Sequence, residues 1–106
     1  MLHERISSSA TSSVFQNLYN DVSKPNSTLF YWSRFWEKVA GEFGTDPAVL
    51  GYELINEPWA GDVFADPKLI VPSVADRENL QPSYDYITDN IRKIDQETLV
   101  FFAAVT

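Results

Sequence analysis

The sequence predicts an α/β fold with parallel strands. Two apolar runs, at residues 49–55 and 98–106, have the composition of buried strands. An amphipathic helix precedes each run, over about residues 28–43 and about residues 80–94. Two strands joined through a helix form a crossover that pairs them in parallel, with both faces of the sheet covered. The order helix, strand, long loop, helix, strand is therefore typical of alternating α/β architecture.

Length and composition limit what the chain can be. With 106 residues, at most one domain is expected, and 44% hydrophobic with 14% aromatic residues are typical of a globular protein. The formal charge of -7 argues against nucleic acid or an anionic membrane as partner, because both require clustered Lys and Arg. The chain has no cysteine, which excludes a disulfide, a thiolate nucleophile and a zinc–sulfur site.

The sequence carries no recognisable targeting segment. No apolar run approaches the roughly 18 residues of a membrane span, and Met1–Arg5 lacks the apolar stretch of a signal peptide. These features predict either an intracellular protein or a sequence that starts after the native start. They predict no particular oligomeric state.

The N-terminal part is expected to be the least ordered. The serine-rich residues 7–13 have no hydrophobic periodicity, which predicts a loop. We therefore expect a poorly ordered tail over residues 1–13 and the folded part over residues 14–106. A short helical turn is expected at residues 14–19, and Lys24–Thr28 then breaks the chain.

The first amphipathic helix is predicted from about Thr28 to Phe43, and Gly44 stands where a helix usually ends. Its apolar side chains repeat at helical spacing, and we expect this face in the core. The members of the face are Trp32, Phe35, Trp36, Val39, Ala40 and Phe43. A turn at Asp46-Pro47 then leads directly into the first strand.

A long connection over residues 60–79 separates the first strand from the second helix. Its apolar content predicts an ordered, packed loop. Asn79 is expected as the N-cap of the helix that follows. That helix shows the second clear apolar face, formed by Leu80, Tyr84, Ile87, Ile91 and Ile94.

The first strand ends in Asn56-Glu57-Pro58-Trp59. Pro58 ends the strand because it has no N–H for the sheet ladder. Ligand sites of α/β folds lie at the carboxyl ends of their strands, where Glu57 stands. A carboxylic acid beside an indole is suited to donate a proton. We therefore take Glu57 as the candidate catalytic residue.

The residues around Glu57 resemble the fourth-strand motif of glycoside hydrolase family 5, and more narrowly its endoglycoceramidase branch. The stretches that carry the resemblance are Gly51–Asp62, Phe15–Tyr19, the helix around Tyr31-Trp32, and Ile91–Asp95. The resemblance covers residues 14–106. It implies part of a (β/α)8 TIM barrel, from about the third helix to the fifth strand. It also implies retaining hydrolysis of the bond between an oligosaccharide and ceramide, with no metal or organic cofactor.

The resemblance assigns Glu57 the role of general acid/base. Such enzymes also need a carboxylate nucleophile about 5–5.5 Å away, which in the family follows the seventh strand and is absent from this chain. Glu53 cannot replace it, because it lies four residues lower on the same strand, roughly 13 Å away, and we interpret it as structural. Asn56 is expected to hydrogen-bond the sugar next to the scissile bond.

Three further positions have open interpretations. Trp59 either stacks on a sugar or the lipid of a glycolipid, or packs beneath its own loop. Asp62 lines the cleft, orders the long loop or is merely solvated. In the fifth-strand run, Ala103-Ala104 stand where the family has a Glu-Pro pair, which puts a polar contact there in doubt. His3 has no match to the family and is expected to be an exposed tail residue.

Two alternatives to an endoglycoceramidase remain open. One is a family 5 endoglucanase acting on polysaccharide, and the other is a non-catalytic sugar-binding or interaction fragment. An enzyme acting on ceramide should carry an apolar shelf, which Val63, Phe64 and Leu69–Val71 would supply. The partner is a glycan or glycolipid in either enzyme. The isolated chain is expected to be inactive, because it lacks the nucleophile and leaves sheet edges open.

The resemblance also implies a secreted or lysosomal protein. The sequon Asn26-Ser27-Thr28 agrees with that compartment. The absence of a signal peptide from the sequence does not support it.

Overall fold

A computed structural model of the chain describes residues 8–19 and 24–105. Its elements, in chain order, are helix α2 (Ser9–Tyr19), helix α3 (Thr28–Phe43), strand β1 (Gly51–Glu53), the 3₁₀ helix η1 (Pro67–Ile70), the π-helical segment η2 (Asp76–Leu80), helix α4 (Gln81–Arg92) and strand β2 (Leu99–Phe101). The two strands pair in parallel, with Tyr52 opposite Val100. This confirms the predicted α/β class and the parallel crossover.

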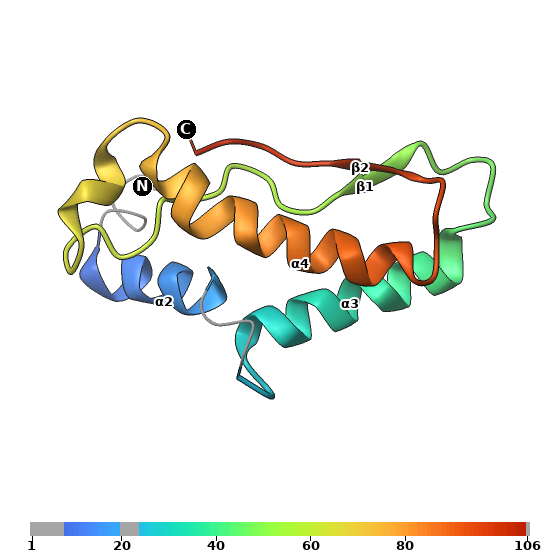
Figure 1. Cartoon of the computed structure of the whole chain (residues 1–106), viewed down its shortest axis with the longest axis horizontal. Coiled ribbons are helices and arrows are strands. Elements are labelled where there is room, and N and C mark those ends of the chain that lie inside the picture. The colour runs from blue at the N-terminus through green and yellow to red at the C-terminus, as the bar shows by residue number, and fades with distance from the viewer. Residues whose placement is uncertain (1–7, 20–23, 106) are drawn as a thin grey trace.

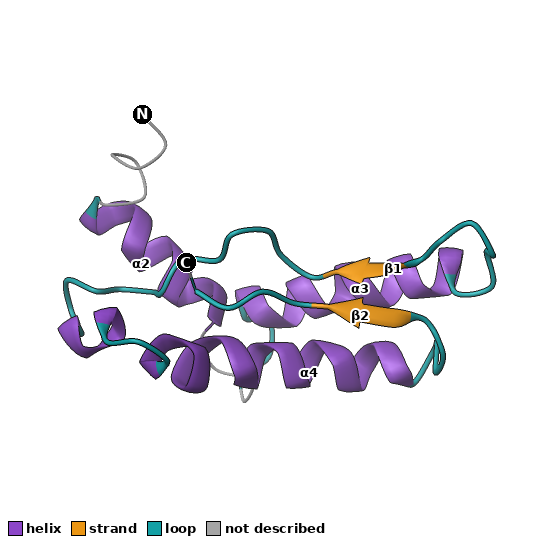
Figure 2. Cartoon of the chain, turned by 90° about the horizontal axis from the view of Figure 1, so that it is seen from above, coloured by secondary structure: helices purple, strands orange, loops and turns teal. Residues whose placement is uncertain are grey.

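The molecule has two layers. Helices α3 and α4 pack against each other beneath one face of the sheet (Figure 1). Both strands run towards the same end of the molecule, where α2 and the segment after β1 lie (Figure 2). The carboxyl ends of the strands are thus gathered at one end, as a ligand site in a parallel sheet requires.

The opposite face of the sheet is open. Tyr52 and Leu54 alternate towards the helices and are buried, whereas Leu99 is 54% exposed and Phe101 is 44% exposed. Seen from above, no described helix lies over the strands (Figure 2). The expectation that both faces would be covered is therefore wrong for this chain, because the described residues supply helices to one face only.

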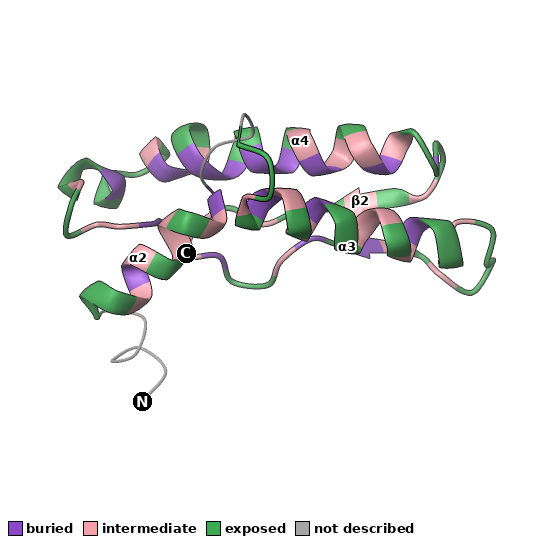
Figure 3. Cartoon of the chain, turned by 90° about the horizontal axis from the view of Figure 1, so that it is seen from below, coloured by how far each residue is buried: buried purple, intermediate pink, exposed green. Residues whose placement is uncertain are grey.

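The core lies between α3, α4 and β1. Figure 3, seen from the helix side, shows buried stretches along the facing sides of α3 and α4. The predicted face of α4 is confirmed at its first four positions, which are 3% exposed or less, but Ile94 is 48% exposed. Ile94 follows the end of the helix, so the helical spacing no longer determines its direction.

Helix α3 has the predicted bounds, and the Ser27 hydroxyl accepts a hydrogen bond from the Phe30 N–H at 3.1 Å as its N-cap. The side of α3 that faces the core differs from the predicted apolar face. Phe35 is 58% exposed and Phe43 is 44% exposed, so the expectation that both would lie in the core is wrong. The buried side chains of α3 are Leu29, Ser33 and Ala40. The Ser33 hydroxyl accepts from the Asn90 amide of α4 at 2.9 Å, so small and polar residues make the close helix contact.

The loop expected over residues 7–13 is wrong from Ser9 onwards, where α2 begins. The Ser8 hydroxyl accepts from the Thr11 N–H at 3.2 Å, and Ser12 is fully buried. Serines that cap a helix or bond across an interface are indistinguishable from loop serines by composition. Residues 1–7 lie outside the described residues, so the expectations for this part of the tail and for His3 stay predictions, whereas residues 9–13 of the predicted tail are helical.

Asp95 anchors the other end of the sheet, at the turn between α4 and β2. Its carboxylate accepts hydrogen bonds from the Tyr52 hydroxyl at 2.7 Å and from the N–H groups of Glu97 and Thr98 at 3.1 Å each. Hydrogen bonds from the Thr98 side chain and from Tyr52 hold the pKa of Asp95 well below its ordinary value. A Cβ at Gly44 would lie 3.1 Å from this carboxylate, so glycine allows α3 to end against Asp95.

Candidate active site at the strand ends

The first strand is shorter than the predicted run over residues 49–55. Its ladder continues one residue past β1, because the Leu54 N–H donates to the Phe101 carbonyl at 3.1 Å. The chain then bends at Asn56 and Glu57, whose side chains are exposed at the carboxyl end of the sheet. Pro58 is buried immediately afterwards. The structure thus places Asn56 and Glu57 together at the predicted end of the strand.

Glu57 has a left-handed backbone conformation, with φ of 46°. A residue with a side chain reaches this region at a cost of roughly 1–2 kcal/mol. The turn separates an exposed carboxyl group from the buried ring of Pro58. Strained backbone of this kind persists only where the neighbouring segments are held in place.

Trp59 is half-buried and bonded to α2. Its indole N–H donates to the Ser12 hydroxyl at 3.1 Å, and its carbonyl oxygen accepts from the Tyr19 hydroxyl at 2.6 Å. Burial raises the pKa of Tyr19 well above its ordinary value, so its hydroxyl stays a donor. These contacts support the interpretation that Trp59 packs within the fold, and the alternative of sugar stacking stays a prediction.

Asp62 begins the long loop and is half-buried. Its carboxylate accepts from the Ala65 N–H at 3.1 Å, and its carbonyl oxygen accepts from the Asp66 N–H at 2.8 Å. These bonds support the interpretation that Asp62 orders the loop. The loop itself is packed as predicted, because Leu69 and Ala75 are 4% and 2% exposed.

Asn79 has a different place from the one predicted. It is not the N-cap of α4, because it lies inside η2, and it is only 7% exposed. Its side-chain amide donates to the Ala60 carbonyl at 2.7 Å and to Gln16 Oε1 at 3.2 Å, and Gln16 Nε2 donates back to Asn79 Oδ1 at 3.1 Å. Sequence reasoning missed this amide pair, whose only signal is the helical spacing of Ser12, Gln16 and Tyr19 on α2.

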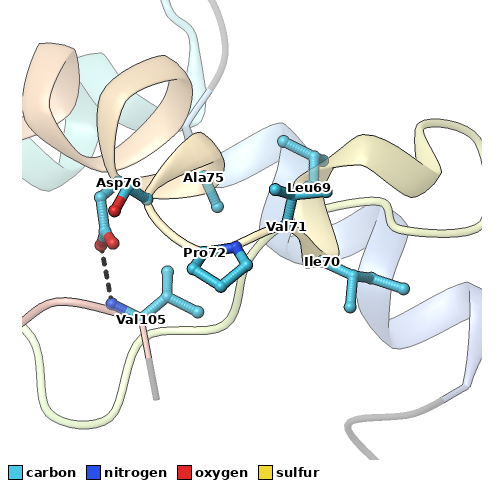
Figure 4. Close-up of a pocket in the computed structure, with 8 residues that line it drawn as sticks. Leu69, Ile70, Val71, Pro72, Ala75, Asp76 and Val105 are labelled. Atoms are coloured by element: carbon cyan, nitrogen blue, oxygen red, sulfur yellow. Dashed lines mark hydrogen bonds between the residues drawn. The ribbon is translucent and has the colours of Figure 1, made fainter.

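An apolar pocket of about 210 Å³ is formed by residues of η1, of η2 and of the segment between them, together with Val105 (Figure 4). Its lining is Leu69, Ile70, Val71, Pro72, Ser73, Ala75, Asp76 and Val105. The Asp76 carboxylate closes one side by accepting from the Val105 N–H at 2.8 Å. The predicted apolar shelf is partly exposed: Phe64, Ile70 and Val71 are 56%, 68% and 55% exposed, whereas Leu69 is buried.

The segment that follows β2 is held by α4. The Tyr84 hydroxyl donates to the Ala103 carbonyl at 2.8 Å, and its ring centroid lies 5.2 Å from that of Phe102. Burial, followed by the nearby Asp76 carboxylate, raises the pKa of Tyr84 to about 12. Ala103 and Ala104 therefore follow β2 at the same end of the sheet as Glu57, without a carboxylate of their own.

Other features of the described residues add little to the site. Within residues 8–19 and 24–105, no three His, Cys, Asp or Glu side chains gather closely enough to hold a metal ion. In the same ranges, no helix is both long and apolar enough to cross a bilayer.

Comparison with known sequences identifies a family. The sequence model of the family described as cellulase (glycosyl hydrolase family 5) matches residues 4–106. The chain is 47% identical over 97 residues to an endoglycoceramidase from Hydra vulgaris and 46% identical over 97 residues to one from Cyanea nozakii. Each match covers 92% of this chain but only 18% and 19% of the relative. The chain thus spans about a fifth of the length of these curated relatives.

A solved structure agrees with the sequence matches. The chain resembles endo-glycoceramidase II from Rhodococcus sp., determined in complex with ganglioside GM3, with a TM-score of 0.68 and 29% sequence identity. The match covers 90% of this chain and 20% of that one. The arrangement of helices and parallel strands described above is therefore shared with a fifth of a larger protein.

Proposed function

Because the chain belongs to glycosyl hydrolase family 5, we propose that it is the part of an endoglycoceramidase-type enzyme that carries the general acid/base, Glu57. The proposal rests on one observation. The exposed Glu57 stands at the carboxyl end of a parallel strand, directly beside the exposed Asn56. The enzyme would be a complete (β/α)8 barrel, with its interior on the open side of β1 and β2.

The chemistry follows from two carboxyl groups acting in turn. Glu57 gives its proton to the glycosidic oxygen while the nucleophile, a carboxylate about 5–5.5 Å away, attacks the anomeric carbon. The deprotonated Glu57 then takes a proton from the water that hydrolyses the glycosyl-enzyme. Asn56 would hold a hydroxyl of the same sugar, where such bonds strengthen in the transition state. The nucleophile has to come from residues outside this sequence.

A glycolipid is the proposed substrate in preference to a polysaccharide. The loop that leaves the end of β1 presents Phe64, Ile70 and Val71 to solvent, and the last two also line the apolar pocket. Exposed apolar side chains of this kind can bind the lipid part of a glycolipid by removing its apolar surface from water. A soluble glucan chain has no comparable apolar part. The relatives named endoglycoceramidase support the same choice.

A chimaera tests both points. The 97 matched residues of the Hydra vulgaris endoglycoceramidase are replaced by those of this chain, and the product is assayed on a fluorescent glycosphingolipid and on a soluble glucan. We expect hydrolysis of the glycolipid only, and a loss of about 10²–10⁴-fold in kcat/KM for Glu57→Gln, the range that acid–base catalysis contributes. Full activity of Glu57→Gln would overturn the assignment, and preference for the glucan would overturn the substrate.

The 106-residue chain alone provides a complementary test. Without a nucleophile, the chain should not cleave the glycosphingolipid, whether or not it binds it. Clear turnover by the purified chain, abolished in Glu57→Gln, would show that the nucleophile lies within this sequence.

We also propose that the protein is made in the secretory pathway. Asn26 is exposed in a turn, with φ of 63°, and it is the acceptor of the sequon that ends at Thr28. Expression in secretory cells should yield a glycosylated form that Asn26→Gln removes. A single unmodified form would contradict the proposal.

A further inference from the structure

One side of α2 holds the segment that follows Glu57. Ser12 accepts from the Trp59 indole, Tyr19 donates to the Trp59 carbonyl, and Gln16 Oε1 accepts from the Asp62 N–H at 3.1 Å. The three α2 residues are spaced by four and three positions, so they lie on one face of the helix. This face is polar, and it contacts backbone as well as side-chain atoms of the strand-end segment.

The Gln16–Asn79 amide pair completes the attachment from the other side. The side-chain Nδ2 of Asn79 donates both to Gln16 Oε1 and to the Ala60 carbonyl. The backbone carbonyl of Asn79 accepts from the Ser83 hydroxyl at 2.7 Å. The backbone between Ala60 and Asp62 is therefore bonded to both members of an amide pair whose side chains also bond to each other. The pair links α2 to η2 across that backbone.

Gly61 shows how closely the backbone passes. It has φ of 119°, and a Cβ there would clash with Gln16 Oε1 and lie 2.6 Å from Asn79 Nδ2. A glycine is required both by the backbone conformation and by the space. A side chain at this position would therefore have to displace the ends of the Gln16 and Asn79 side chains.

Glu57 lies between two attached segments. On one side, the Leu54 N–H is bonded to the β2 strand, and on the other side Trp59 is bonded to α2. The left-handed turn at Glu57 is unfavourable by itself and depends on its flanks being held. We propose that Gln16 and Asn79 are positioning residues for Glu57: their amide pair holds the backbone after the turn and thereby the carboxyl group. This inference rests on the proposed acid/base role of Glu57.

The test compares two substrates whose leaving groups differ in their need for a proton. A displaced general acid should slow hydrolysis only where the leaving group needs that proton. The ceramide of a glycolipid leaves as an alkoxide unless its oxygen is protonated, whereas an acidic phenol leaves an aryl glycoside as a phenolate without needing a proton. In the chimaera, Gln16→Met should lower kcat/KM on the glycolipid by about 10–100-fold, as a misplaced catalytic group does. The loss on the glycolipid should fall on kcat, whereas kcat/KM on the aryl glycoside, whose first step needs no proton from Glu57, should fall by less than about threefold.

Two variants set the scale. Gln16→Glu keeps the oxygen that accepts from Asp62 and Asn79, so it should retain more activity on the glycolipid than Gln16→Met. Gln96→Met makes the same change at an exposed position in the turn before β2, at the other end of the sheet, and should leave both activities unchanged. Equal losses of Gln16→Met on both substrates, or no loss on either, would overturn the positioning role.

Glu57→Gln in the same chimaera separates the two proposals. Its loss should also be larger on the glycolipid than on the aryl glycoside. If it shows no such difference, the proposed function is wrong. If it shows the difference and Gln16→Met does not, the function stands and the positioning role is wrong.

A measurement on the 106-residue chain is independent of activity. Amide hydrogen exchange and backbone chemical shifts are recorded by NMR for the wild type, Gln16→Met and Gln96→Met. In Gln16→Met, we expect faster exchange of the Asp62 amide and a changed backbone shift at Glu57. Unchanged values at both residues would overturn the inference.

Discussion

The hydroxyl group of Tyr52 donates a hydrogen bond of 2.7 Å to the carboxylate of Asp95, which lies 43 residues later in the chain. Tyr52 belongs to β1 and Asp95 to the turn before β2, so the bond ties the start of the second strand to the first. Both residues are buried, at 3% and 6% exposure. The bond lies at the end of the sheet opposite Glu57, where it bears on stability rather than on chemistry.

Tyr52→Phe should therefore destabilise the chain. The substitution keeps the ring beside Trp36, with centroids 5.8 Å apart in the wild type, and removes only the hydroxyl. We expect the free energy of unfolding to fall by about 1–3 kcal/mol, the cost of losing a donor to a buried charged group. Urea denaturation measures it. Tyr31→Phe is the matched control: its exposed hydroxyl bonds Asn26 at 3.3 Å, and its removal should change stability by less than about 0.5 kcal/mol.

The same carboxylate should make stability depend on pH. The pKa of Asp95 is lower in the folded chain than its ordinary value of 3.8, so the unfolded chain takes up a proton first as the pH falls. The contribution of Asp95 is present in full above about pH 5 and is lost progressively as the pH falls from about 4 through the folded-state pKa. Unfolding free energies measured from pH 6 to pH 2 should fall less steeply in Asp95→Asn than in the wild type. Parallel curves would contradict the expectation.

A pair of glycine substitutions tests how closely Gly61 lies against the Gln16–Asn79 amide pair. Gly61→Ala should cost about 1–3 kcal/mol, because φ of 119° disfavours a side chain and the new Cβ would displace Gln16. Gly41→Ala, inside α3, meets no atom within 4 Å and should stabilise the chain by about 0.5–1 kcal/mol. Thermal unfolding monitored by circular dichroism measures both. A neutral Gly61→Ala would show that the segment moves away at little cost.

The open face of the sheet should make the isolated chain associate. Leu99 and Phe101 on this face are about half exposed, and exposed apolar surface of this kind promotes contact between molecules. Leu99→Lys should lower both the binding of an apolar dye and the apparent mass at high concentration, measured by light scattering. Val14→Lys changes a side chain that is 66% exposed on α2 and should leave both unchanged. Equal effects of the two variants would show that the sheet face is not responsible.

The amphipathic elements could be predicted from the sequence because their apolar side chains repeat at helical spacing. The bounds of α3 and the four buried positions of the second apolar face follow from that pattern, and the parallel strands follow from two apolar runs joined through a helix. The core face of α3 could not be predicted in full. Ser33 takes a core position through its bond to Asn90, and hydrophobic periodicity does not register a buried serine.

The site could be predicted in part. Glu57 and Asn56 were recognisable from their place after an apolar strand and from the family motif, and the family itself is confirmed. Their catalytic and sugar-binding roles stay predictions. The Gln16–Asn79 pair could not be predicted, because it joins amides 63 residues apart whose meeting depends on the folded chain. For the same reason, Asn79 was assigned to a local cap rather than to a long-range contact.

The link between α2 and η2 limits how this region can be exchanged between relatives. The partners of Ala60 and Asp62 come from a helix before β1 and from a segment well after it. A recombination breakpoint placed anywhere between residues 16 and 79 would combine Gln16 and its helix from one parent with Asn79 and its segment from another. The smallest portion that can be swapped intact is therefore this whole stretch, rather than the single strand that bears Glu57.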